Sequence, residues 1–245
     1  MDSGYYAACT ALKTQSQALE LAANNIANVN TSGYRGQIPS FQSLLMAGSN
    51  GQPVSGWSRL INQFSVVNGT RLDLGEGNLE HTANPLDLAI EGPGFFAVQT
   101  KAGTLYTRNG NFRVSATGQL VTAAGDPLLA ESGPIAVPGG PVSVSSDGTV
   151  SVNGALAGKL RIVEFSTATA VTPAGGSYYS AAAKDAKPAL GSVVQQGMIE
   201  SSNVNPVAAM VGLISAQRQA EMIERAMSAF YADFNRIAAD ELPRI

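Results

Sequence analysis

Apolar residues recur every seven positions at both ends of the chain. At the N-terminal end the repeat consists of Tyr5, Leu12, Leu19 and Ile26. At the C-terminal end two interleaved repeats form one apolar stripe, made up of Leu213, Ala216, Ala220, Ile223, Met227, Phe230, Phe234 and Ile237. An apolar repeat of 3.5 residues commits a helix to pack against another helix. The pattern therefore predicts two terminal helices with coiled-coil-like packing, either against each other or against neighbouring subunits.

Both predicted helices have recognisable ends. The first is expected over residues 4–28, and Gly33 supplies the stop because glycine readily adopts the left-handed conformation beyond a helix. The second is expected to begin at Asn205, a favourable N-cap, with Pro206 at the first helical position, and to end near Asp240. Two long helices are thus expected at the two ends of the sequence, with the rest of the chain between them.

The outward face of the first helix carries mainly amides and hydroxyls. Asn24, Asn25 and Asn28 lie on it, and only Lys13 and Glu20 are charged. Solvated helix faces usually carry alternating charges. We therefore expect the asparagine face to contact further protein and to belong, with the two apolar stripes, to an assembly interface.

Between the helices the hydrophobic period changes to two. Alternation over residues 86–91 is typical of a strand with one buried face. Asn109-Gly110 and Asp147-Gly148 are two-residue turn signals that each predict a hairpin, and Asn153-Gly154 marks the next turn. The Ser/Ala/Pro-rich stretch Thr167–Pro188 favours a loop insertion. Many short strands with regular turns indicate a mostly antiparallel β domain.

These patterns together predict an α+β fold. Residues 1–35 and 198–245 are expected to form a terminal helical assembly domain, and residues 71–197 a central β domain. Residues 36–70 form the connector between them, for which an extended hairpin is one expectation.

The charge content is low for a chain of this length. Charged residues make up 13% of the 245 residues, where about 25% is usual. A net charge of −3 gives no electrostatic footprint for nucleic acid or an anionic membrane. Two interpretations stay open: an exported protein with a neutral polar surface, or a surface that is largely covered by other protein.

The sequence offers little material for catalysis. One histidine, His81, and one cysteine, Cys9, exclude a multi-His or Cys/His metal site within one chain. Gly92-Pro93-Gly94 lacks the third glycine of a dinucleotide loop and the lysine of a P-loop. Asp87 and Glu91 share a strand face, but nothing around them indicates a catalytic pair. We therefore predict no catalytic, cofactor or metal site, and no enzyme activity.

Targeting signals are also missing from the sequence. The N-terminus has no basic region followed by an apolar run, so no ordinary secretory signal is present. No stretch approaches the roughly 18 apolar residues of a membrane span. We expect no membrane insertion, and any export must use another route.

Three segments resemble the axial proteins of the bacterial flagellum, the family of rod and hook proteins. Residues 23–35 (ANNIANVNTSGYR) are similar to its N-terminal signature. Residues 86–96 (LDLAIEGPGFF), followed by 106–112 (YTRNGNF), are similar to its central motif. Residues 197–207 (GMIESSNVNPV) resemble the stretch that enters its C-terminal helix. The motifs occur in family order and span nearly the whole chain.

The resemblance implies a structural subunit of the basal-body rod, exported through the flagellar type III apparatus without a cleaved signal peptide. Such a subunit would assemble with copies of itself and with other rod proteins in the periplasm, and would transmit torque from motor to hook. The short length and the opening residues 1–8 are most similar to a proximal rod protein. Distal rod and hook proteins are the alternatives within the family.

Two other classes remain open on the residues alone. One is a monomeric surface-binding β module whose helices merely pack on it. The other is an enzyme of unfamiliar type. Self-association through the ends of the chain distinguishes the assembly prediction from both.

Overall fold

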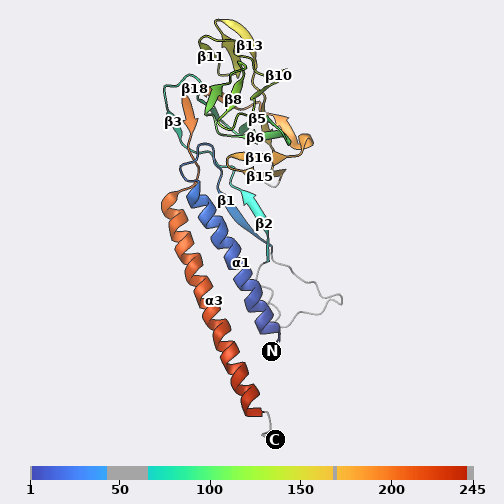
Figure 1. Ribbon diagram of the computed structural model, residues 1–245, viewed down its shortest axis with the longest axis vertical. Helices are drawn as coiled ribbons and strands as arrows, with labels where there is room; N and C mark the ends of the chain where they lie inside the picture. The colour runs from blue at the N-terminus through green and yellow to red at the C-terminus, as the bar shows by residue number, and fades with distance from the viewer. Residues whose placement is uncertain (1, 43–65, 168–169, 242–245) are drawn as a thin grey trace. The chain divides into compact units, whose positions relative to one another are not determined.

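The structure is a computed structural model that describes residues 2–42, 66–167 and 170–241, with side chains for 9–39, 70–167, 170–229 and 231–232 (Figure 1). The chain forms two compact units. The helical unit contains Met1–Ile26, Pro39–Thr70 and Pro206–Ile245, and the β unit contains Ala27–Ile38 and Arg71–Asn205. The chain thus passes between the units four times, after residues 26, 38, 70 and 205.

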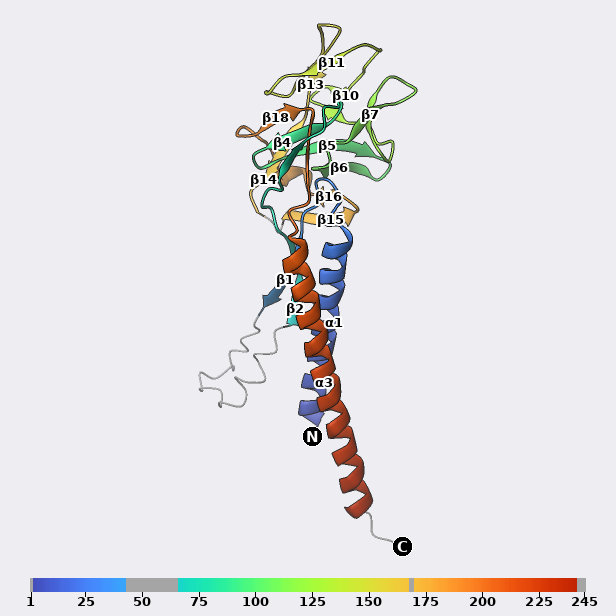
Figure 2. The ribbon, with the colours of Figure 1, turned by 90° about the vertical axis from the view of Figure 1, so that its left-hand side faces the viewer.

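The helical unit is built on the two expected helices. Helix α1 spans Asp2–Ala27 and helix α3 spans Pro206–Glu241. They lie side by side in both views (Figures 1 and 2). Helix α3 starts at the proline expected in its first position, where a missing N–H leaves no hydrogen bond unmade. Among the described residues, no helix is long and apolar enough to cross a membrane.

Two strands flank the central part of the connector. Strand β1 (Gln37–Gln42) and strand β2 (Val66–Leu72) form a two-stranded sheet. Residues 43–65 between these two strands lie outside the described residues. The extended hairpin expected over residues 36–70 stays a prediction.

The β unit is made of short strands whose pairings are antiparallel. Its largest sheet has six strands in the order β15-β16-β6-β5-β14-β17. Those strands span Val171–Gly175, Tyr178–Ala181, Gly103–Thr107, Gly94–Thr100, Ile162–Phe165 and Ala186–Pro188. The α+β class is therefore confirmed, with helices at the two ends and antiparallel strands between them.

Smaller sheets complete the β unit. The three-stranded sheet β11-β12-β13 contains Val142–Val144, Thr149–Val152 and Ala155–Lys159. Strand pairs β18-β4, β19-β3, β7-β8 and β10-β9 make up the rest. Their strands are Val193–Gln196, Leu88–Glu91, Met198–Glu200, Leu79–His81, Phe112–Val114, Leu120–Thr122, Gly133–Pro134 and Leu129–Ala130.

Strand β5 divides the hydrophobic core into two clusters. Phe96 and Val98 point into one cluster, whereas Phe95 and Ala97 point into the other. Successive side chains of a strand face opposite sides of the sheet, so the core covers both faces of β5. Both faces are packed with aromatic rings, and the ring centroids of Phe96 and Phe112 lie 5.2 Å apart.

The hairpin predicted at Asp147-Gly148 and the turn predicted at Asn153-Gly154 are confirmed. Strands β11 and β12 pair across the Asp147-Gly148 turn, and strands β12 and β13 pair across Asn153-Gly154. At the second turn both residues have positive φ, 53° at Asn153 and 80° at Gly154. This is the backbone that a two-residue hairpin requires.

The predicted hairpin at Asn109-Gly110 is wrong. Strand β6 before it pairs with β5 and β16, whereas β7 after it pairs with β8. The dipeptide crosses between two sheets, and a Cβ on Gly110 would collide with the carbonyl oxygen of Leu88. The glycine is needed there for close backbone approach, which a turn signal read from sequence does not distinguish from a hairpin.

The loop insertion expected at Thr167–Pro188 is also wrong. This stretch contains β15, β16, the short 3-10 helix η2 (Ala183–Asp185) and β17, so it supplies both edges of the six-stranded sheet. Val171 and Tyr179 are buried. Packing against the core holds these residues as strands although their composition is typical of loops.

Candidate assembly site

On α3 the residues of the apolar stripe are less exposed than those between them, whereas on α1 other residues, such as Ala11, are buried at least as deeply as the stripe. Ala216 is buried, and the other described members of the stripes are half-buried: Leu12, Leu19, Ile26, Leu213, Ala220, Ile223 and Met227. Tyr5, Phe230, Phe234 and Ile237 are helical, but their side chains lie outside the described residues. The predicted seam residues that can be described therefore share one environment.

A hydrogen bond joins the two helices directly. The side-chain amide of Gln15 on α1 donates a hydrogen bond of 2.9 Å to the carbonyl oxygen of Ala216 on α3. The small side chain of Ala216 leaves its backbone open to this approach. The contact sits on the predicted stripe of α3.

The predicted asparagine face is partly exposed. Asn24 is exposed, whereas Asn25 and Asn28 are half-buried. The hydroxyl of Thr31 donates to the Asn28 side-chain oxygen over 3.2 Å. Asn28 therefore helps to end α1 as well as lying on the face assigned to assembly.

Helix α3 also carries an apolar face that the described part of the chain leaves exposed. Val207, Met210, Val211 and Ile214 are each more than half exposed. Their spacing of three and four residues places them on one side of the helix. Large apolar side chains gathered on one face mark a surface for contact with another protein.

Three charged residues are buried together inside the β unit. Glu200 pairs through one carboxylate oxygen with Arg35, at 2.6 Å, and through the other with Arg108, at 3.0 Å. All three side chains are at most 1% exposed. We call Arg35, Arg108 and Glu200 the ion-pair cluster.

Arg108 is held by more than its ion pair. Its guanidinium donates to the carbonyl oxygens of Ile90, at 3.0 Å, and of Gly92, and lies over the ring of Phe95. Burial lowers the pKa of Arg108 to about 10, against the opposing influence of the Glu200 carboxylate. The guanidinium therefore remains charged at neutral pH.

The ion-pair cluster also lies where the segment after α1 (residues 27–38) meets the segment before α3 (residues 198–205), and we call these two segments the two crossings. The backbone N–H of Gly33 donates to the carbonyl oxygen of Glu200 over 2.8 Å. The backbone N–H of Arg35 donates to the Tyr179 hydroxyl over 2.7 Å. Gly33 has a φ of +67°, and a Cβ there would overlap the backbone of Arg108 and Asn109. The segment after α1 thus packs directly on the segment before α3.

Asn203 ties the two crossings together a second time. Its side-chain oxygen accepts from the Gly36 N–H at 2.7 Å. Its amide group donates to the carbonyl oxygens of Asp73, at 3.0 Å, and Gly75, at 2.9 Å. One asparagine side chain therefore joins three separate stretches of backbone.

The ion-pair cluster unites the three sequence motifs, and sequence reasoning did not find it. Arg35 ends the first motif, Arg108 lies in the central one and Glu200 in the last. The available signal was charge, because Arg35 and Glu200 are the single charged residues of the first and last motifs and Arg108 is the single basic residue of the central one. The unit boundaries follow from these contacts: residues 27–35 and 198–205, expected with the helices, group with the β unit.

The described residues offer no metal-binding arrangement. No group of three or more His, Cys, Asp or Glu side chains among them is placed to hold an ion. His81 is exposed on β3. Asp87 accepts a hydrogen bond from Asn84, and Glu91 accepts one from Gln195. The two carboxylates thus have separate structural partners.

Comparison with known proteins identifies the family. Family models match for flagella basal body rod protein (residues 6–35), for the flagellar hook protein FlgE/F/G D1 domain (89–152) and for the flagellar basal body rod FlgEFG protein C-terminal region (195–230). These matches cover the first helix, much of the β unit and most of α3.

Individual relatives match over most of their length. The flagellar basal-body rod protein FlgF of Caulobacter vibrioides is 32% identical over 100% of both chains. The FlgF of Escherichia coli is 32% identical over 99% of this chain and 98% of its own. The FlgG of Agrobacterium fabrum is 32% identical over 88% of this chain and 90% of its own. The chain belongs to the family of flagellar basal-body rod proteins and is a structural subunit of that rod.

Proposed function

We propose that this chain is a proximal rod subunit, of the FlgF type, that polymerises through its terminal helices and transmits torque from motor to hook. Its partners are other copies of itself and other rod proteins. It leaves the cytoplasm through the flagellar type III export apparatus without a cleaved signal peptide.

The apolar surface of α3 carries this proposal. One side of the helix, around Ala216, contacts α1 through Gln15. Another side presents Val207, Met210, Val211 and Ile214 to solvent. A helix with two apolar sides is suited to one partner within its own chain and another in a neighbouring subunit. The coiled-coil-like seam is part of the proposal.

The hydrogen bonds between the two crossings support a role in carrying load. Force that enters through either helix reaches the β unit by a chain crossing. Gly33 and Gly36 on one crossing are bonded to Glu200 and Asn203 on the other. The two crossings therefore respond to force as one connected structure, which a torque-bearing subunit requires.

The proposed position in the rod rests on alignment coverage. FlgF relatives from C. vibrioides and E. coli align over nearly all of both chains, whereas the FlgG relative from A. fabrum aligns over about nine tenths. Identity is the same in all three. The two full-length alignments to FlgF proteins are the support for the proximal assignment.

A pair of neighbouring substitutions on α3 tests the helix seam. Met227 is half-buried on the stripe, whereas the next residue, Ser228, is exposed. Met227→Asp places an unpaired charge in the seam and removes part of the stabilisation, about 1.5–3 kcal/mol, that full burial of a methionine side chain contributes. We expect loss of swimming in soft agar and loss of the subunit from purified basal bodies, with the β-sheet circular dichroism unchanged.

Ser228→Asp is the matched control, because it adds the same charge one residue away on an exposed face. It should swim and assemble as the unmodified chain does. Normal motility of Met227→Asp would refute the seam assignment. Analytical ultracentrifugation of the full chain also separates the proposal from a monomeric β module, which would not self-associate at any concentration.

A further inference from the structure

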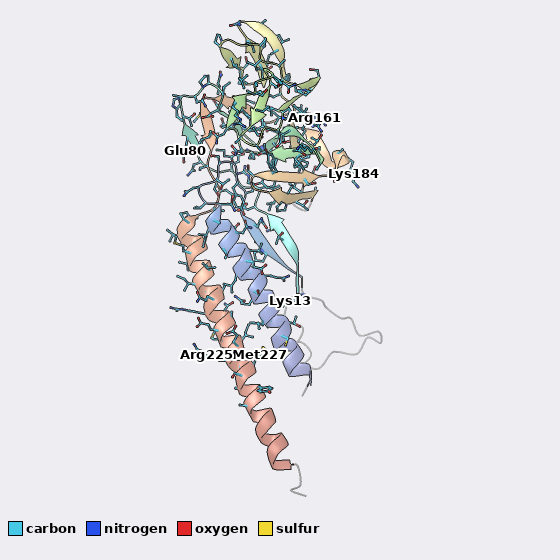
Figure 3. All side chains as sticks on the ribbon, in the orientation of Figure 1. Lys13, Glu80, Arg161, Lys184, Arg225 and Met227 are labelled. Atoms are coloured by element: carbon cyan, nitrogen blue, oxygen red, sulfur yellow. The ribbon has the colours of Figure 1, made fainter. Side chains whose placement is uncertain are left out.

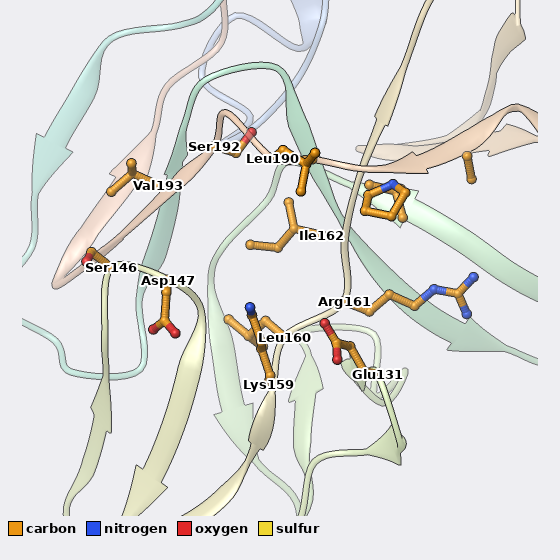
Figure 4. Close-up of a pocket in the computed structure, with 14 residues that line it drawn as sticks. Glu131, Ser146, Asp147, Lys159, Leu160, Arg161, Ile162, Leu190, Ser192 and Val193 are labelled. Carbon is orange, nitrogen blue, oxygen red and sulfur yellow. The ribbon is translucent and has the colours of Figure 1, made fainter.

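A groove on the β unit is floored by apolar residues and edged by an exposed leucine. It has a volume of about 630 Å³. Leu160 and Ile162 lie at its base, and Leu190 and Val193 line one side (Figure 4). Leu190 is 94% exposed. The charged residues around the groove are balanced, two acidic and two basic: Glu131, Asp147, Lys159 and Arg161.

The far end of the β12–β13 hairpin presents a second exposed leucine. Leu156 is 74% exposed and is the second residue of β13, just after the Asn153-Gly154 turn. Residues 132–158, which form this end of the β unit, contain a single charged residue, Asp147. Interface cores are depleted in charge. An exposed leucine on an uncharged surface therefore has the character of an interface residue.

Leu156 cannot reach the groove of its own chain. Lys159, on the edge of the groove, pairs with Thr149 at one end of the hairpin, whereas Leu156 pairs with Ser151 near the turn at the other. Three residues of extended strand separate Leu156 from Lys159 by about 10 Å. The strand is fixed in its sheet on this side by β12, so the leucine cannot fold back.

We propose that Leu156 of one copy of this chain inserts into the groove beside Leu190 of a second copy. An apolar side chain on an uncharged turn fits an apolar floor, and the balanced charges at the edge favour neither an anionic nor a cationic ligand. Both halves of the contact are surfaces of the same β unit, so every copy carries one of each.

This contact deepens the proposed function, on which it rests, by adding a β-unit interface to the helix seam. Because it joins two different surfaces, each copy that donates Leu156 still offers its own groove to the next. Contacts of this type propagate into open assemblies when rotation does not close them. The geometry suits a subunit repeated along a rod.

Cysteine cross-linking of the full chain tests the contact. All variants carry Cys9→Ser, which removes the single native cysteine. Leu156→Cys and Leu190→Cys are then purified separately and mixed under mild oxidation. Both positions are exposed, so neither change disturbs the core. We expect disulfide-linked dimers from the mixture and none from either variant alone.

A control pair measures chance collision. Ala102→Cys replaces Leu156→Cys in the mixture, because Ala102 is an exposed residue at another turn, between β5 and β6. Dimer yield no higher than with this control overturns the proposal. Equal dimer yield from one variant alone would indicate a contact of a surface with itself, and would overturn it too.

The double variant with both cysteines distinguishes open from closed assembly. We expect a ladder of dimers, trimers and larger species, whereas arrest at the dimer contradicts the open arrangement. Leu156→Asp should self-associate about tenfold or more weakly than the unmodified chain, since it replaces a leucine that the proposed contact buries by a charge.

The same cysteine pair expressed in cells separates this proposal from the proposed function. If the chain is recovered in basal bodies without cross-links, the rod role stands and the groove contact is overturned. A chain absent from basal bodies overturns the rod role, whereas the purified mixture still decides the contact between β units.

Discussion

Glu200 holds two buried arginines that would otherwise repel each other. Its carboxylate lies 2.6 Å from the Arg35 guanidinium and 3.0 Å from that of Arg108. Removing one partner from a buried ion pair is strongly destabilising, because the remaining charge keeps its desolvation cost without compensation. The cluster therefore depends on Glu200 more than on either arginine.

Glu200→Gln should lower the free energy of unfolding by about 3–5 kcal/mol. Urea unfolding of the full chain, followed by β-sheet circular dichroism, measures the change. Glu131→Gln is the matched control, because Glu131 is exposed and its substitution should cost less than about 0.5 kcal/mol. A similarly small effect at Glu200 would show that the cluster does not stabilise the β unit.

Titration of Arg108 does not alter this comparison near neutral pH. The pKa of Arg108 is lowered from 12.5 to about 10 in the folded chain, and burial is the largest cause of this shift. Below pH 10 the folded and unfolded chains both bind the proton, so this group adds no pH dependence. Above it the unfolded chain binds more protons, and the contribution to stability rises with pH.

Gly33 is another residue on which the packing depends, because there is no room for a single added carbon atom. Its φ of +67° disfavours any side chain, and a Cβ would overlap the Arg108 and Asn109 backbone. Gly176 has a similar φ of +56°, but a Cβ there would meet nothing within 4 Å. Comparing Gly33 with Gly176 therefore separates the cost of a side chain on a left-handed backbone from the cost of a steric collision.

Gly33→Ala should therefore destabilise the chain more than Gly176→Ala. We expect about 1 kcal/mol for Gly176→Ala from the left-handed backbone alone, and a loss several times larger for Gly33→Ala, measured by urea unfolding. Equal losses would mean that the crossing at Gly33 adapts to a methyl group, and would contradict the close packing of the two crossings.

Among the elements, the helices were the easiest to predict and the strand pairings the hardest. The heptad stripes and the Asn205-Pro206 start place α1 and α3 within a few residues of their observed ends. Helix periodicity is local, because its hydrogen bonds join residues four apart. Strand pairing is not, and Asn109-Gly110 was mistaken for a hairpin because its partners lie elsewhere in the sequence.

Strand β16 shows how tertiary packing overrides composition. The stretch Thr167–Pro188 has few large apolar residues, yet Tyr179 of β16 is 1% exposed and receives a hydrogen bond from Arg35. Burial also raises the pKa of the Tyr179 hydroxyl, so it keeps its proton and stays a neutral partner. No local sequence pattern predicts the hydrogen bond between Arg35 and Tyr179.

When the chain is monomeric, we expect proteases to cleave the helical unit before the β unit. Lys13 on α1 and Arg218 and Arg225 on α3 are exposed, and Lys13 and Arg225 are marked in Figure 3. Helical stability comes mostly from packing of an apolar face, and part of the α3 face has no cover in the described chain. We expect the helices to open often in dilute solution.

Limited trypsin digestion followed by mass spectrometry tests this expectation. Cleavage at Lys13, Arg218 and Arg225 should precede cleavage at Lys159 and Arg161, which are exposed but lie beside or within the sheets of the β unit. Arg35 and Arg108, which are buried, should be cut last. Helices as resistant as the β unit would show that they are stable without assembly.

The sequence alone determined the two helices, the antiparallel β region, the absence of a recognisable catalytic motif and the rod family. Each rests on local periodicity or on a contiguous motif, which the linear order of residues contains in full. Only the tertiary structure brought Arg35, Arg108 and Glu200 together and turned Asn109-Gly110 into a crossing between sheets. Arg108 and Glu200 are 92 residues apart, and contact over such a separation follows from how the sheets pack around β5, which no local pattern encodes.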